Sequence, residues 1–187
     1  MSSETDLSVR ESRSRPGLLI EAARRGDETA FESLVTARIE RTYRIALAIL
    51  GSEADARDAV QDGWVAVWRK LPSLANDDRF DAWVDSIVVN ACRMTIRKRR
   101  RVREITLVED LDRHALEPGP DQFSEREALA RAFGRLSVDH RAILVLHHLE
   151  DQPVAAIAAR LGVPVGTAKS RLFAARAALQ QNLEAER

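Results

Sequence analysis

The sequence predicts an all-α protein made of two small helical domains, with a helix-turn-helix at the end of the second. Three observations favour this class. Apolar residues recur at helical spacing, helix-capping residues and glycines delimit the helices, and a flexible acidic segment containing Pro and Gly separates two helical stretches. We therefore expect a disordered tail, a first domain, a linker and a second domain at residues 1–16, 17–103, 104–123 and 124–183.

The composition is that of a globular protein without a membrane span. Of 187 residues, 45% are apolar and 31% are charged, and the longest apolar runs are far too short to cross a bilayer. The polar N-terminus has no features of a signal peptide. The single cysteine, Cys92, cannot form an internal disulfide, and we expect it to be a small buried apolar residue. These features favour a cytoplasmic protein.

No catalytic or metal-binding motif stands out in the sequence. There is no Gly-rich phosphate loop, CxxC pair or nucleophile–base arrangement. His147 and His148 are adjacent and therefore point to different sides of a helix, which is unsuitable for a pair of metal ligands. We expect no cofactor, no metal and no enzymatic activity.

The first domain opens with a regular apolar stripe. Its members are three or four positions apart, which predicts one continuous helix of about five turns that ends at Gly51. These residues are Phe31, Val35, Ile39, Tyr43, Ala46 and Leu50.

The helix expected after Ser52 has two contrasting faces. A buried stripe includes Val60 and Trp64, while the outer side is acidic and carries Asp58, Gln61 and Asp62. An acidic helix face is usually only solvated. However, Trp64 and Trp68 border this one, and aromatic side chains of this kind can anchor a protein partner. The face is therefore a candidate protein-binding surface.

The helix expected from Arg79 or Phe80 becomes strongly basic along its length. Such dense like charges repel one another unless solvent or a polyanion compensates, and a nucleic-acid backbone is a natural partner. Just ahead, Trp83, Asn90 and the loop 76–79 suit stacking on unpaired bases and hydrogen bonding to them, although Trp83 could instead pack in the core. The cations are Arg93, Arg97, Lys98, Arg99, Arg100, Arg101 and Arg103.

The C-terminal stretch 151–179 has the pattern of a helix-turn-helix. A short apolar helix stops at Gly162, and Pro164 suits the start of a second helix. The outward side of that second helix offers donors for phosphates and base edges, and one ring that can contact a thymine methyl group. These residues are Thr167, Lys169, Ser170, Arg171, Phe173 and Arg176. The alternative is an ordinary solvated helix pair in a bundle.

Four blocks of the sequence resemble, in the same order, the two conserved domains of the extracytoplasmic-function sigma factors of bacterial RNA polymerase, which belong to the sigma-70 family. The resemblance covers nearly all of residues 18–183. Four ordered matches are more specific than a helix-turn-helix alone, which would also suit many repressors. The blocks, starting at Ala30, Asp55, Arg79 and Arg135, read AFESLV, DARDAVQDGWVAVWRKL, RFDAWVDSIVVNACR and RLSVDHRAILVLHHLEDQPVAAIAARLGVPVGTAKSRLFAARAAL.

This resemblance implies partners and roles for the candidate residues. The first domain would bind the clamp of the largest polymerase subunit through Asp58, Gln61 and Asp62, and the chain would also meet the flap of the second-largest subunit. Promoter DNA would be the second partner, and an anti-sigma factor the third. At the -10 element, Trp83 and Asn90, with the loop 76–79, would capture a flipped base of the non-template strand. Arg93, Arg97 and Arg100 would bind the DNA backbone beside it. The outward residues of the last helix would read the -35 element.

Two other functions remain open at this point. A dimeric helix-turn-helix repressor would need a symmetric operator and a dimer face. A protein-binding regulatory adaptor would not need the cations between Arg93 and Arg103.

Overall fold

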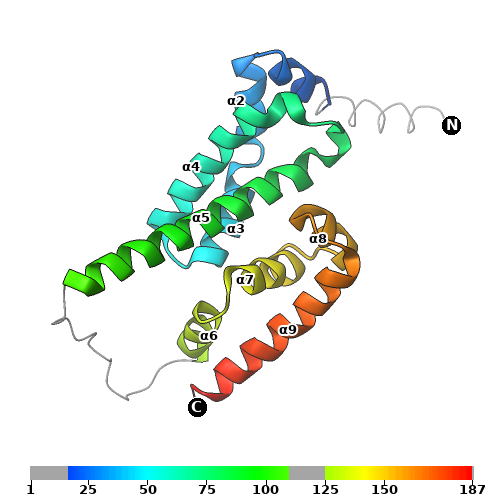
Figure 1. Ribbon diagram of the computed structural model, residues 1–187. Helices are drawn as coiled ribbons and strands as arrows, with labels where there is room; N and C mark the ends of the chain where they lie inside the picture. The colour runs from blue at the N-terminus through cyan, green and yellow to red at the C-terminus, as the bar shows by residue number, and fades with distance from the viewer. Residues whose placement is uncertain (1–16, 110–124, 187) are drawn as a thin grey trace.

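All regular secondary structure in residues 17–109 and 125–186, which are the residues that the computed structural model describes, is helical (Figure 1). No strand occurs within these ranges, and the predicted all-α class is confirmed. The expected N-terminal tail lies outside the described residues, as does most of the expected linker.

The first group of helices surrounds a long helical pair. A first helix spans residues 17–24 and is followed by α2 (Glu28–Thr36), α3 (Ile39–Leu50), α4 (Glu53–Lys70) and α5 (Phe80–Glu109). Two 3-10 turns, Leu71–Ser73 and Asp77–Arg79, lie in the connection from α4 to α5. The pair α4 and α5 runs side by side (Figure 1). Helix α5 continues past Arg103, where the sequence placed the end of the first domain.

A glycine allows α4 and α5 to approach closely. A Cβ atom added at Gly63 would lie 3.2 Å from the Cγ2 of Val88, which is tighter than an ordinary side-chain contact. Since protein interiors are densely packed, a Cβ atom at this point would require Val88 to shift by a few tenths of an ångström. Gly63 therefore suits the close approach of the pair that carries most of the candidate site.

The prediction of one continuous helix from Phe31 to Leu50 is wrong. The chain breaks at Ala37 and Arg38, where Arg38 has φ -130° and ψ -11° and precedes α3. Its guanidinium group bonds Asp81 of α5 at 2.5 Å. The break thus coincides with a contact between Arg38 and a residue 43 positions away, and helical spacing cannot predict such a contact.

The break also changes which residues are buried. Leu34, Ile45 and Ile49 are fully buried, whereas Ile39 is 38% exposed and Phe31 is only half-buried. Because the chain turns between α2 and α3, Phe31, Val35, Ile39 and Tyr43 of the expected stripe line a surface groove.

The second group of helices ends in the predicted helix-turn-helix. It contains α6 (Glu125–Gly134), α7 (Val138–Leu144), a π-helical turn (Val145–Leu149), α8 (Val154–Leu161) and α9 (Val165–Glu184). Gly162 adopts φ 64° and ends α8, and α9 starts directly after Pro164, as the sequence predicted. Helix α9 packs against α6, α7 and α8.

Ion pairs join the two groups of helices where α7 and α8 meet α3 and α5. The fully buried Asp85 of α5 accepts two hydrogen bonds from Arg41 of α3, at 2.9 and 2.8 Å, and also pairs with Arg160 of α8. Arg41 makes a further bond of 2.8 Å to Glu150. Two cations that come from different groups of helices therefore share one buried carboxylate.

The thiol of Cys92 is buried in α5, as expected, and burial raises its pKa to about 12. Because the thiolate is the reactive form, we expect alkylation by iodoacetamide at pH 8 to be about a thousandfold slower in the folded protein than for an ordinary thiol. Mass spectrometry of labelled protein would measure this. Unfolding in urea should restore the normal rate, and rapid labelling without urea would contradict the prediction.

Candidate protein and nucleic-acid interfaces

The acidic face of α4 is set by the start of that helix. Ser52 caps it by accepting a hydrogen bond from the backbone N–H of Asp55 at 3.4 Å. This start places Asp58, Gln61 and Asp62 on the exposed side, while Ala56, Val60 and Val67 are buried on the other. The acidic face, defined as Asp58, Gln61 and Asp62, is therefore accessible to a partner.

An apolar groove of about 810 Å³ adjoins the acidic face between α2, α3 and α4. The ring of Phe31 lies 4.7 Å from that of Trp68 and 6.0 Å from that of Trp64, measured between centroids. Trp64 is nearly buried, and its indole N–H donates to Thr42 at 3.2 Å. The residues lining the groove include Phe31, Val35, Ile39, Tyr43, Gln61, Trp64, Val65 and Trp68.

Sequence reasoning missed this groove because it placed Phe31 and Tyr43 on the apolar stripe of one continuous helix. One local signal was available. Val65 and Trp68 lie three positions apart on α4 beside the buried stripe, next to Gln61 of the acidic face, and Val65 is 43% exposed. A second apolar face on an otherwise charged helix is typical of a protein-binding surface.

Trp83 and Asn90 line one pocket of about 540 Å³ between α4 and α5, together with Ser86, Gly63 and Asp62. Trp83 is half-buried, with its ring centroid 6.2 Å from that of Phe80, and Asn90 is exposed. An exposed amide and a partly exposed ring in one pocket can hydrogen bond and stack with a planar group. The structure thus brings together the two residues that the sequence paired.

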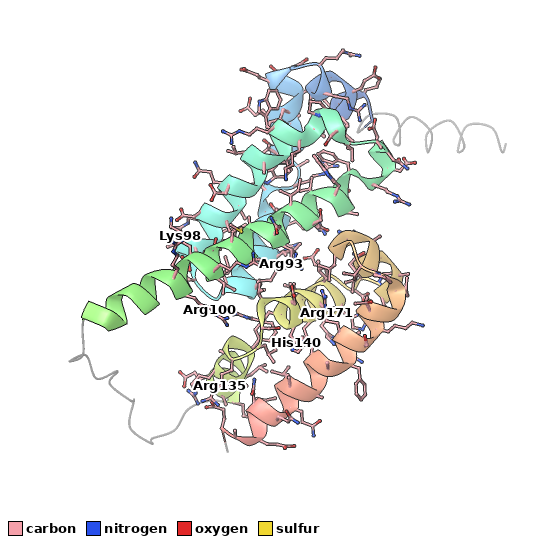
Figure 2. The ribbon with its side chains drawn as sticks, viewed as in Figure 1. Arg93, Lys98, Arg100, Arg135, His140 and Arg171 are labelled. Atoms are coloured by element: carbon pink, nitrogen blue, oxygen red, sulfur yellow. The ribbon has the colours of Figure 1, made fainter. Side chains whose placement is uncertain are left out.

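The cations of α5 fall into two sets. Figure 2 shows Arg93 and Arg100 on the side of α5 toward α7, and Lys98 on the other side. Arg93 is half-buried and its Nε donates to Asp139 of α7 at 2.8 Å, whereas Arg97 and Arg100 are exposed. Arg93 therefore already has a carboxylate partner from the second group of helices.

The second set of cations faces the acidic face across an open groove of about 1010 Å³. Arg97, Lys98 and Arg101 line one side of it, and the acidic face lines the other. The surface expected to bind protein and the surface expected to bind nucleic acid thus border each other.

Helix α9 presents most of its candidate residues to solvent, and Phe173 is 78% exposed. Arg171 differs because it is half-buried, and two positions along a helix place it about 200° from Phe173. Figure 2 draws Arg171 between α9 and α7. The exposed members are Thr167, Lys169, Ser170, Phe173 and Arg176.

Arg176 lies next to a histidine of the π-helical turn. Its Nη2 is 3.3 Å from Nε2 of His148. Desolvation, together with the charges of His147 and Arg176, lowers the pKa of His148, which favours the neutral form of the ring that can accept from Arg176. The contact holds the Arg176 side chain at the surface of α9.

A second apolar groove, of about 910 Å³, lies between α6, the π-helical turn and α9. Leu129 and Leu149 are 46% and 54% exposed at its edge, and Phe133 lies within it. In the described part of the chain, no group of three or more His, Cys, Asp or Glu side chains is placed to hold a metal ion. None of the helices described is long and apolar enough to cross a membrane.

The fold and these surfaces define a two-part α-helical protein of the helix-turn-helix class. Residues 34–102 match the family model for sigma-70 region 2, and residues 126–179 match that for sigma-70 region 4. The chain is 34% identical to the ECF RNA polymerase sigma factor SigM of Mycobacterium tuberculosis over 161 residues, covering 84% of this chain and 79% of SigM. The chain belongs to the extracytoplasmic-function (ECF) family of RNA polymerase sigma factors.

Another relative and two solved structures are also similar to this chain. The ECF sigma factor SigE of Mycolicibacterium smegmatis is 32% identical over 166 residues, which cover 84% of this chain and 64% of SigE. CnrH in complex with the cytosolic domain of CnrY has a TM-score of 0.65 and 29% identity, over 92% of this chain and 99% of that one. RpoE of Bartonella quintana in complex with the anti-sigma factor NepR has a TM-score of 0.62 and 25% identity, over 84% and 98%.

Proposed function

We propose that this chain is an alternative sigma factor that binds core RNA polymerase, recognises the -10 and -35 elements of promoters and promotes their opening. The ordered matches to region 2 and region 4 carry this proposal. The chain catalyses no bond chemistry itself and acts without a cofactor in the cytoplasm, where the polymerase works. Residues 17–103 and 124–183 form the two functional domains, with the acidic segment 104–123, whose first six residues continue α5, between them and the tail 1–16 ahead of them.

The acidic face and the adjoining apolar groove form the surface for the clamp of the largest polymerase subunit. Exposed carboxylates at Asp58 and Asp62 attract cations of a partner and set the orientation of docking. The rings of Phe31 and Trp68 supply the apolar contact area that usually provides most of the binding energy. Charge and apolar area lie side by side here.

The pocket that contains Trp83 and Asn90 receives a base flipped out of the -10 element. Extracting a base costs a few kcal/mol of unstacking, which stacking and hydrogen bonding in a pocket can repay. Arg97 and Arg100 are exposed and bind the adjoining phosphates. Arg93 contributes as well once its pair with Asp139 is exchanged for a phosphate, so we expect the contact between the two groups of helices to open on promoter binding.

Helix α9 reads the -35 element in the major groove. Lys169, Phe173 and Arg176 lie within one exposed sector, Ser170 lies beside it, and Thr167 is exposed near the start of the helix on the side of Arg171. Arg171 stands apart from this sector, and we assign it to a phosphate at the edge of the contact. The apolar groove between α6 and α9 suits the flap of the second-largest subunit.

An anti-sigma factor is the third proposed partner. RpoE of Bartonella quintana was solved with the anti-sigma factor NepR, which supports a partner of this kind for a relative of similar fold. The two apolar grooves are the surfaces that such a protein would cover.

Run-off transcription with purified core polymerase on a promoter library tests the proposal. We expect start sites that appear only when this chain is added, with core polymerase alone as the control. Absence of any start site that depends on the chain would contradict the proposal. A stable dimer in light scattering without polymerase would instead favour a dimeric repressor.

Replacing Arg97 and Arg100 together by Ala should weaken promoter binding by the holoenzyme and flatten its salt dependence. Each lost phosphate contact reduces the slope of log affinity against log salt by about one. Fluorescence anisotropy at several salt concentrations measures this slope. Unchanged binding would favour a protein-binding adaptor, because such a protein has no need of these cations.

A further inference from the structure

The connection between α4 and α5 is held from outside by an arginine of the first helix. Nη2 of Arg24 donates to the backbone carbonyl of Leu74 at 3.2 Å and forms an ion pair with Asp77. The side chains of Arg24 and Asp77 are 29% and 35% exposed, so solvent only partly screens the pair. A single side chain thereby fixes both the backbone and a carboxylate of this connection.

A second arginine holds the other end of the same segment. Arg38, at the break between α2 and α3, donates to Asp81 at 2.5 Å, and its guanidinium carbon lies 5.0 Å from the ring centroid of Phe80. Its side chain is 17% exposed. Phe80 in turn contacts Trp83 of the proposed base pocket. Arg38 is therefore connected to that pocket through one aromatic ring.

Between these two anchors the segment presents polar groups to solvent. Leu71 and Leu74 are buried beneath it, and the side chain of Asn76 accepts from the N–H of Asp78 at 2.9 Å. Asn76, Asp78 and Arg79 are exposed. The backbone is therefore fixed, in part by Asn76 itself, while the side chains of Asp78 and Arg79 face solvent, where they could meet a base.

We infer that Arg24 and Arg38 are positioning residues that hold the segment 74–81 in the shape that selects a base of the -10 element. The inference rests on the proposed function. Neither arginine needs to touch DNA. A segment that is already ordered fits one base better than the others, whereas a loose segment must be ordered on binding and adapts to several bases. Loss of either anchor should reduce selectivity more than affinity.

Hydrogen exchange tests the holding role without polymerase. In Arg24→Ala, the amides of residues 74–79 should exchange about tenfold faster, while those of α7 stay unchanged. Arg25→Ala is the matched control, since Arg25 is the next residue and pairs with Glu21 at 2.7 Å on an exposed surface. Equal exchange in Arg24→Ala and wild type would overturn the inference.

Base preference tests the selective role. Holoenzyme would be titrated with single-stranded -10 oligonucleotides that carry each of the four bases at every position in turn. Arg24→Ala should lower the ratio of best to worst affinity by about fivefold to tenfold at the selected position, with binding of a -35 duplex unchanged. The double variant Arg24→Asp with Asp77→Arg should restore the preference by reversing the ion pair.

Two outcomes separate this inference from the proposed function. A wild-type base preference that persists in Arg24→Ala, or an equal loss of affinity for all four bases, would overturn the inference alone. A wild-type holoenzyme without any base preference would overturn the proposed function, and the selective role of Arg24 with it.

Discussion

Asp58→Arg is expected to abolish co-purification of this chain with core RNA polymerase. Asp58 is exposed on α4 at the centre of the acidic face, so its replacement leaves the core of the protein untouched. Placing a cation against a surface selected for carboxylates costs several kcal/mol, which corresponds to a loss of affinity of at least about 100-fold. Pull-down with tagged core polymerase and a titration by anisotropy would measure the loss.

Glu53→Arg is the matched control for this experiment. It makes the same change of charge on the same helix, but Glu53 lies about 140° around α4 from Asp58 and pairs with Arg57 on an exposed surface. This control should still bind, and circular dichroism should show both variants folded. Retained binding by Asp58→Arg would place the clamp surface elsewhere on the chain.

Asp85→Ala is expected to destabilise the folded chain by about 3–5 kcal/mol, because it leaves the partly buried guanidinium groups of Arg41 and Arg160 without their shared carboxylate. This is a large part of the total of about 5–15 kcal/mol that is typical of a native protein. Burial already lowers the pKa of Arg160, an effect that the charge of Arg41 increases, so removing the carboxylate between these two cations would be unfavourable even though Arg41 keeps its bond to Glu150. Urea denaturation followed by circular dichroism would give the free energy of unfolding.

Glu53→Ala serves as the reference for the stability experiment. The pair of Glu53 with Arg57 is 68% exposed on both sides, and its loss should cost no more than about 1 kcal/mol. The loss of unfolding free energy in Arg160→Ala should lie between those of Asp85→Ala and Glu53→Ala, since Asp85 keeps its two bonds to Arg41. An equal effect of Asp85→Ala and Glu53→Ala would show that the buried ion pairs do not stabilise the chain.

Local signals along the sequence were sufficient to predict several elements. Ser52 starts α4, Gly162 ends α8 and Pro164 precedes α9, because a helix end depends on residues within about one turn of it. The same short range allowed Trp83 and Asn90 to be paired, as they lie two turns apart on one helix and line one pocket. The acidic face of α4 could be predicted for the same reason, because its three residues are close neighbours on one helix.

The break at Arg38 and the apolar groove could not be predicted in this way. The stripe from Phe31 to Leu50 keeps its helical spacing across the break, so nothing in its periodicity marks the turn. The partners of Arg38 on α5 are 42 and 43 positions further along the chain. The change of direction between α2 and α3 coincides with these distant contacts of Arg38, and Phe31 lines a surface groove beside it.

By itself, the sequence determined the helical class, the helix-turn-helix and the faces that carry charge, because propensity, capping and periodicity act between neighbours in the chain. Only the tertiary structure decided which charges are paired. Asp85 holds Arg41 and Arg160, and Arg24 holds Asp77, across separations of 44, 75 and 53 residues. Such pairs depend on how helices pack, and packing brings together side chains that no local pattern connects.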